Sequence, residues 1–179
     1  MFGEPVMARK SRSSGGEVDA GTRRYGGWLA AVLLLAAAAR GGVLVWAERQ
    51  PERFDFPDSR RYLVVARHLA AGDGPMESPE VRAGTDPLYP AVLAAGLRLG
   101  WAEEDADGAS LMRFGRLVNG VFGVISVALL AAFARRLFGE RPALAAAAIL
   151  AVDPILVYFH ALVLTETCYT ALLLAAFYC

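Results

Sequence analysis

Apolar residues are concentrated in four runs along this 179-residue chain, at about residues 27–46, 114–134, 142–158 and 162–179. A helix of about 20 apolar residues covers the roughly 30 Å hydrocarbon layer of a bilayer. Trp28 and Trp46 lie at the two ends of the first run, where aromatic side chains favour the membrane interface. The pattern therefore predicts an all-α, multi-pass membrane helical bundle with about four transmembrane helices.

Residues 47–112 are too polar to enter a bilayer, and we predict an extracytoplasmic loop that contains amphipathic surface helices. The first of these helices opens at Asp58, a predicted N-cap, and ends at Gly72. Its apolar face follows helical spacing and consists of Tyr62, Val65, Ala66 and Leu69. A second helix is predicted to begin near Pro87, with Asp86 as its cap.

Basic residues beside the apolar runs predict the orientation, because cytoplasmic segments are enriched in Lys and Arg. Arg23 and Arg24 precede the first run, and the second run is separated from the third by Arg135, Arg136 and Arg141. We predict a multi-pass protein of the cell membrane with a disordered cytoplasmic tail at residues 1–26. A cleavable signal peptide is the less favoured alternative, because its charged region would be too long.

Composition narrows the class of protein. Hydrophobic residues make up 56% of the chain, which excludes disorder. Eighteen basic and eighteen acidic residues cancel, so the net charge gives no information about nucleic-acid binding. We predict no nucleic-acid partner. Residues 47–112 hold twelve of the acids and seven of the bases, a local net charge of −5. Cys168 and Cys179 would lie about 16 Å apart on one helix, too far for a disulfide.

Three ionisable residues are candidates for chemistry. Asp58 lies outside the membrane but close to the first span, where a carboxylate could accept a proton from a hydroxyl group. Its alternative role is that of a helix cap. Glu166 lies near the start of the fourth run and could bind a divalent cation, a sugar hydroxyl or an arginine, or face interfacial water. His160 could titrate near neutral pH but lacks partners at metal-ligand spacing.

Arginine supplies the remaining candidates. The guanidinium groups of Arg60, Arg61, Arg82 and Arg113 could bind phosphate as planar forks, or pair with the nearby acids. Arg40 lies inside the first apolar run, where it either extends to the interface or faces an anionic ligand. No Gly-rich phosphate loop, Cys/His metal spacing or nucleophile elbow occurs, so cofactor and metal requirements stay open.

Short motifs recur in a fixed order along the chain. They are D-x-x-x-Y (Asp58, Tyr62), A-x-x-L-x-x-G (Ala66, Leu69, Gly72), T-D-P-L-Y-P (85–90), R-x-x-N-G-x-x-G (116–123), R-R-L-F-G (135–139) and L-T-E-T (164–167). In this order they resemble the GT-C membrane glycosyltransferases. The resemblance is to the dolichyl-phosphate-mannose protein mannosyltransferase and aminoarabinose-transferase-like superfamily, a glycosyltransferase family 39-like group. It covers residues 28–179.

This resemblance implies an inverting transfer of a sugar from a polyprenyl-phosphate donor to an acceptor hydroxyl at the outer membrane face. Asp58 matches the catalytic aspartate of the family and Glu166 a second active-site acid. We assign substrate-binding roles to Tyr62, Arg60, Arg61 and His160. The implied partners are membrane lipid, the polyprenyl-phosphate-linked sugar and an acceptor that the sequence does not identify.

Two departures from the family pattern affect this prediction. Some relatives carry a phosphate-binding lysine where this chain has Thr85 and Asp86. Relatives have about eleven or more spans, so we predict that this chain corresponds to their N-terminal part. A non-catalytic scaffold or truncated remnant is the main alternative function, and a transport module is a weaker one.

Overall fold

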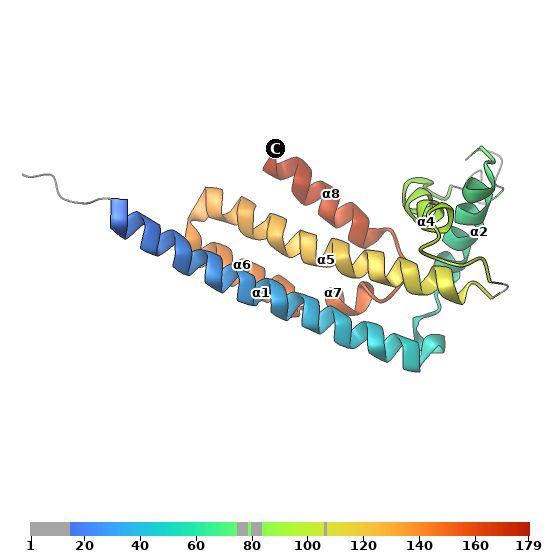
Figure 1. Ribbon diagram of the computed structural model, residues 1–179, viewed down its shortest axis with the longest axis horizontal. Coiled ribbons are helices and arrows are strands. Elements are labelled where there is room, and N and C mark those ends of the chain that lie inside the picture. The colour runs from blue at the N-terminus through green and yellow to red at the C-terminus, as the bar shows by residue number, and fades with distance from the viewer. Residues whose placement is uncertain (1–14, 75–78, 80–83, 106) are drawn as a thin grey trace, which may run out of the picture.

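The computed structural model describes residues 15–74, 79, 84–105 and 107–179, and all regular structure there is helical. Its elements are α1 (Gly15–Arg49), η1 (Pro51–Phe54), α2 (Pro57–Ala71), α4 (Leu88–Arg98), α5 (Ala109–Phe138), α6 (Glu140–Val152), α7 (Pro154–Phe159) and α8 (Glu166–Tyr178). Helices α1, α5, α6 and α8 run along the long axis as a bundle, and α2 and α4 pack together at one end (Figure 1). The predicted all-α class is confirmed.

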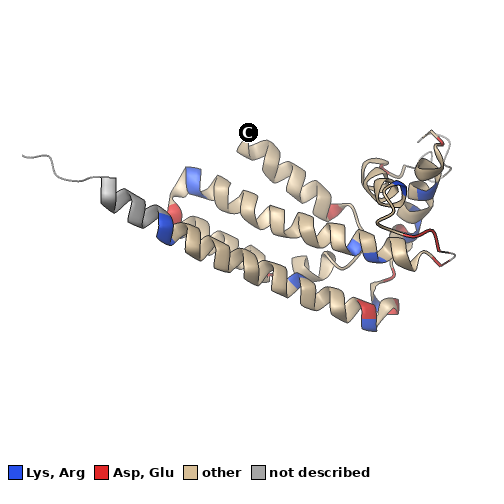
Figure 2. Ribbon diagram, in the orientation of Figure 1, with Lys and Arg blue, Asp and Glu red and all other residues tan. Residues whose placement is uncertain are grey.

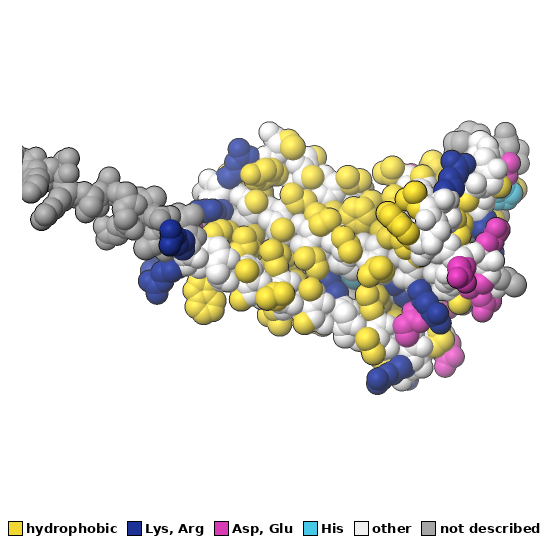
Figure 3. Space-filling model, in the orientation of Figure 1, with side chains coloured by type: hydrophobic (Ala, Val, Ile, Leu, Met, Phe, Trp, Pro, Cys, Tyr) yellow, Lys and Arg dark blue, Asp and Glu magenta, His cyan; other side chains and the backbone are white. Residues whose placement is uncertain are grey.

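Two of the described helices are long and apolar enough to cross a membrane, at Arg23–Arg49 and Ala109–Phe138. Much of the apolar surface of α1 is uncovered by protein, and Leu34 is 72% exposed. Hydrophobic side chains are spread over the flank of the bundle in Figure 3. A continuous apolar surface of this kind suits a lipid environment. Helices α6 and α8 have 13 residues each, and the count of four spans stays a prediction.

Charged residues gather at the two ends of the bundle and leave its middle mostly uncharged (Figure 2). The start of α1 and the end of α5 meet at one end, where the Arg135 guanidinium lies 4.3 Å from the centroid of the Tyr25 ring. Arg136 there donates to the backbone oxygen of Tyr178, at 2.6 Å. The basic residues used to predict orientation therefore share one end of the molecule, as the prediction requires.

The N-terminal boundary of α1 differs from the sequence prediction. Residues 15–26, expected to be disordered, form the first turns of α1, whereas residues 1–14 lie outside the described part. Extending an existing helix adds one hydrogen bond per residue without a new nucleation cost. The helix formed by the apolar segment therefore extends through the polar residues that precede it.

The start of α2 also differs from the prediction. Asp58 is not the N-cap, because that position belongs to Phe56, whose backbone is extended at φ −109° and ψ 143°. A residue before proline avoids the helical region, so Pro57 fixes the start of the helix and Asp58 falls within its first turn. The C-terminal prediction is confirmed, since Gly72 ends α2 in the left-handed region at φ 102°.

The apolar face of α2 is confirmed as a face, but it packs against protein rather than lipid. Val65 and Ala66 are fully buried, and α2 packs on α4, where Leu93 is also fully buried. Asp86 is not the N-cap of α4, because that position belongs to Pro87, but its carboxylate accepts from the Leu88 N–H at 2.9 Å. This α2–α4 pair forms a compact unit beside the N-terminal end of α5, which positions the candidate site.

The third apolar run is interrupted where Asp153–Pro154 indicates a break. Helix α6 ends at Val152 and α7 begins at Pro154, which lacks the N–H that a continuous helix would use. The Asp153 side chain caps α7 by accepting from the Leu156 N–H at 2.9 Å. Helix α7 is six residues long and ends next to His160, where a non-helical connection leads to α8.

Candidate active site

The connection between α7 and α8 is held in place by polar side chains from α5. The Asn119 side-chain amide donates to the carbonyl oxygens of Leu162 at 2.6 Å and Leu164 at 3.2 Å. Arg116 Nε donates to the Ala161 oxygen at 3.1 Å. Buried carbonyl groups outside a helix need such partners. These bonds fix the segment that leads directly into Glu166.

A second contact joins this segment to α2. The hydroxyl oxygen of Tyr62 lies 3.5 Å from Thr165 Oγ1, at the threshold of a hydrogen bond. The Tyr62 ring packs edge-on against Tyr89, with 5.7 Å between ring centroids. Tyr89 in turn donates to the Gly115 oxygen at 3.3 Å, and burial raises the pKa of its hydroxyl, which stays a neutral donor. Residues far apart in sequence thus meet at one end of the bundle.

Asp58 lies one helical turn before Tyr62, about 6 Å along the axis of α2. Its side chain is 53% exposed, and its carboxylate lies 3.5 Å from Arg61. The carboxylate is therefore open to an approaching substrate. Tyr62 and Thr165 connect it to the segment that carries Glu166.

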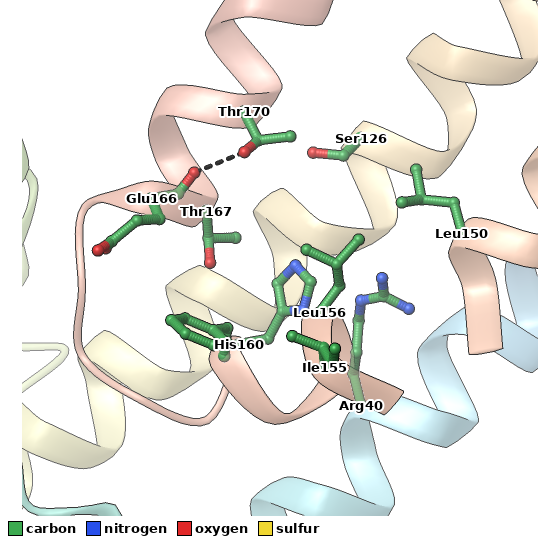
Figure 4. A pocket seen from close by; sticks show the side chains of 10 residues that line it. Arg40, Ser126, Leu150, Ile155, Leu156, His160, Glu166, Thr167 and Thr170 are labelled. Carbon is green, nitrogen blue, oxygen red and sulfur yellow. Dashed lines mark hydrogen bonds between the residues drawn. The ribbon is translucent and has the colours of Figure 1, made fainter. Parts of the chain in front are cut away.

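Glu166 begins α8 and is exposed, as its predicted position at the end of a span requires. It lies at the rim of a cavity of about 290 Å³ that is also lined by Arg40, His160 and Thr167 (Figure 4). Figure 4 shows its carboxylate pointing away from Arg40, toward the outside of the cavity. Glu166 therefore presents its charge on the side opposite to the buried guanidinium.

Arg60 and Arg61 are both engaged with carboxylates. Arg60 forms a forked ion pair with Asp55, with Nε at 3.2 and 3.1 Å from the two carboxylate oxygens. The hydrogen bond from Arg60 lowers the pKa of Asp55. Arg61 lies beside Asp58. Either arginine would have to exchange a carboxylate for a phosphate to bind a donor. Arg82 lies outside the described residues.

His160 and Arg40 lie in the bundle rather than at its end. His160 is 7% exposed and Arg40 is 2% exposed. Both contact Gly123 of α5 so closely that an added Cβ would collide with the imidazole and with the Arg40 Nε. The interpretation that Arg40 extends to the interface is wrong, because its Nη1 donates to the carbonyls of Ala36 at 3.0 Å and Ala151 at 3.1 Å. These carbonyls draw the guanidinium inward.

Comparison with known proteins identifies the family. Residues 88–179, more than half of the chain, match the family model described as dolichyl-phosphate-mannose-protein mannosyltransferase. The chain belongs to this mannosyltransferase family. No curated protein matches the chain, and neither does any solved structure.

Membership of the mannosyltransferase family confirms the resemblance noted in the sequence, and this is a family of membrane glycosyltransferases of the GT-C type. The matched part contains Asn119, His160 and Glu166 but begins after α2. The roles predicted for Asp58, Tyr62, Arg60 and Arg61 therefore depend on geometry and on the motif order, and stay predictions.

The structure adds three residues that sequence reasoning gave no role in the site. Arg116 and Asn119 hold the α7–α8 connection, and Thr165 meets Tyr62. A usable signal was present, because buried polar residues inside a membrane span are costly and are usually retained for a reason. Among the described residues, no cluster of three or more His, Cys, Asp or Glu could hold a metal ion.

Proposed function

We propose that this mannosyltransferase-family chain is the N-terminal part of an enzyme that transfers a sugar from a polyprenyl-phosphate donor to an acceptor hydroxyl at the non-cytoplasmic membrane face. The acceptor oxygen attacks the anomeric carbon of the sugar. The bond from that carbon to the phosphate oxygen breaks, and the lipid phosphate leaves with the electron pair. The hydroxyl proton moves to Asp58, which acts as the general base. The configuration at the sugar carbon is inverted.

One observation carries this proposal beyond family membership, namely the contact between Tyr62 of α2 and Thr165 beside Glu166. It brings the segment with Asp58 to the start of α8, so two acids that are 108 positions apart in the sequence belong to one end of the bundle. Asp58 is exposed in the first turn of α2 and needs no rearrangement to meet a substrate. Glu166 is proposed to bind a sugar hydroxyl or a cation beside it.

The proposed orientation follows from the two ends of the bundle. Arg135 and Arg136 lie at the end opposite to α2 and α4 (Figures 1 and 2). Basic residues favour the cytoplasmic side, so Asp58 is assigned to the outer side. Tyr62 is proposed to position the substrate beside Asp58. Arg60 and Arg61 are proposed to bind donor phosphate after exchanging their carboxylate partners, and His160 to contact the donor from the cavity.

The test is transfer of label from polyprenyl-phosphate [³H]mannose in membranes from cells that make the natural protein, with the Asp58→Asn variant as the comparison. Loss of the base should lower the transfer rate about 100-fold or more, while the amount of protein in the membrane is unchanged. Asp73→Asn is the matched control, because Asp73 is an exposed carboxylate at the other end of α2. Transfer by Asp58→Asn at the wild-type rate would reject Asp58 as the base.

A further inference from the structure

Helix α4 has an apolar face that the described part of the chain leaves uncovered. Leu88, Ala91, Ala95 and Leu99 follow one another at the spacing of one helical face, and all four are exposed. The other face is buried, because α4 packs there against α2 and α5. A helix that is apolar on both faces needs an apolar environment on its second face as well. The uncovered face therefore marks a site of interaction.

The uncovered face carries no charged side chain of α4. Arg98 is the single charged residue of this helix. It turns back to α2, where its guanidinium donates to the backbone oxygens of Leu69 at 2.7 Å and Ala70 at 3.2 Å. These carbonyls belong to the last turn of α2, where acceptors lack partners within the helix. The uncovered face is thus left to apolar side chains, among them Leu88 and Leu99, which are 55% and 59% exposed.

Contacts with α5 and α1 place α4 at the height of the predicted membrane interface. An added Cβ on Gly96 would collide with the Phe114 ring, so the backbone of α4 touches α5 at this residue. The neighbouring Arg113 is paired with Glu48 at 2.8 Å. Glu48 lies two residues after Trp46, which is at the interfacial end of the first predicted span. Helix α4 therefore lies beside the ends of both long apolar helices.

The direction of α4 suits this position. Figure 1 shows α4 nearly end-on, whereas α1 and α5 run across the view. The axis of α4 therefore crosses the bundle axis and would lie in the plane of a membrane that α5 spans. In Figure 3, hydrophobic side chains over α4 lie beside those on the flank of the bundle. The uncovered face is thus continuous with the apolar surface that suits lipid.

Trp101 follows α4 and extends this surface. Its side chain is 69% exposed, and its ring centroid lies 6.3 Å from that of Phe114. Tryptophan is enriched at the membrane–water interface, because its ring is amphipathic. A tryptophan that contacts a spanning helix and faces outward is typical of a residue at that interface.

We infer that α4 is an interfacial anchor, and that its face of Leu88, Ala91, Ala95 and Leu99, together with Trp101, enters the boundary between the headgroups and acyl chains of the bilayer that the bundle spans. The partner is the lipid of that leaflet, which is bound by apolar contact. Because α2 packs on α4, the anchor holds the α2–α4 unit against the membrane. The inference does not depend on the proposed transfer reaction, because no step of that reaction involves this face.

Fluorescence of Trp101 tests this position. Trp28→Phe and Trp46→Phe leave Trp101 as the single tryptophan of the full chain, which is reconstituted in phosphatidylcholine vesicles. Bromine atoms on the acyl chains of the lipid should lower its emission about two-fold, because a ring at the interface lies within their reach. Iodide present in the water on both sides of the membrane should quench the emission much less.

Variants in this background then test the face of α4. Combining Leu88→Asn with Leu99→Asn removes its two largest apolar side chains and should reduce the bromine quenching of Trp101 about two-fold or more. Val64→Asn is the matched control, because Val64 is a 36% exposed apolar residue beside Arg60 and Arg61 on the charged face of α2. It should leave the quenching unchanged.

Three results would overturn the inference. Strong quenching by iodide without quenching by bromine would mean that Trp101 faces water. Protection from both quenchers would mean that protein covers the face, as another segment or a second copy of the chain. Equal quenching in the double variant and in Val64→Asn, with helical content retained by circular dichroism, would mean that the face of α4 does not enter lipid. Asp58→Asn should keep the bromine quenching, so a failed anchor is separate from a failed assignment of the catalytic base.

Discussion

Two arginines are buried among the residues that the structure describes, Arg116 at 4% and Arg40 at 2% exposure, yet their surroundings differ. Arg116 Nε donates to the Ala161 carbonyl, and its Nη1 lies 3.3 Å from a carboxylate oxygen of Glu48. Within the described part of the chain, Arg40 donates only to backbone carbonyls, and its Nε and Nη2 have no hydrogen-bond partner. Burial alone therefore does not reveal what a charged side chain does. The two buried arginines differ in whether a carboxylate lies beside the guanidinium group.

The largest effect expected from this comparison is on stability. Arg116→Met removes the anchor of the α7–α8 connection and leaves Glu48 with Arg113 as its remaining ion-pair partner. We expect the free energy of unfolding to fall by about 3 kcal/mol. Arg40→Met removes an uncompensated buried charge and only two hydrogen bonds to carbonyls, so the loss should stay below about 1 kcal/mol.

Unfolding of both variants in the same detergent, followed by circular dichroism, measures this difference. Arg113→Met is the matched control, because its side chain is 67% exposed and should change stability by about 0.5 kcal/mol or less. If Arg40→Met were the less stable of the two buried-arginine variants, the neighbouring carboxylate would not be what makes Arg116 the more stabilising arginine.

A smaller effect is expected at Asn119, the neutral neighbour of Arg116 on the same helix. Asn119→Leu leaves the carbonyls of Leu162 and Leu164 without their donor. We expect a loss of about 2 kcal/mol, since buried polar groups that lose their partners cost roughly 1–3 kcal/mol. Amide hydrogen exchange should rise between residues 160 and 166, where the connection would open.

Ser126→Ala is the control for Asn119, because Ser126 donates only to the Phe122 carbonyl within its own helix. Its exchange pattern between residues 160 and 166 should match that of the wild type. Equal protection of this segment in Asn119→Leu and wild type would show that Asn119 does not hold the connection. Arg116 would then be the one residue of this pair that holds the α7–α8 connection.

Local patterns in the sequence predict the parts of the fold that depend on neighbouring residues. The period of apolar residues identifies α5 and the buried face of α2, and Asp153–Pro154 predicts the break before α7. Each of these features is decided within one or two helical turns. The same reasoning misplaced the start of α2, because the constraint that Pro57 imposes on Phe56 outweighs the capping preference of Asp58.

Contacts between distant segments could not be predicted in the same way. Asn119 meets carbonyls 43 and 45 positions away, and Tyr62 meets Thr165 across 103 positions. The direction of Arg40 depends on Gly123, which leaves space on a different helix. Sequence shows that a charge within an apolar run is costly. Only the packing of three helices shows whether it turns toward lipid or toward a cavity.

The smallest effect is expected from a third arginine, Arg60, which is 74% exposed and paired with Asp55. The hydrogen bond from Arg60 lowers the pKa of Asp55 below its unfolded value of about 3.9. A lowered folded-state pKa contributes stability above the unfolded pKa, and that contribution is lost as the pH falls through the folded pKa. The pair should therefore stabilise the protein at pH 7 and contribute nothing once Asp55 is protonated.

A double-mutant cycle of Arg60→Gln and Asp55→Asn isolates this pair from the general effect of acid on the protein. The coupling in unfolding free energy should be small but positive at pH 7, and it should decline as the pH falls below the unfolded pKa of about 3.9. Because Arg60 faces solvent, added salt should also weaken it. A coupling that persisted in acid would mean that Arg60 does not interact with the ionised carboxylate of Asp55. Arg60 would then no longer serve as the exposed case of an arginine paired with a counter-charge.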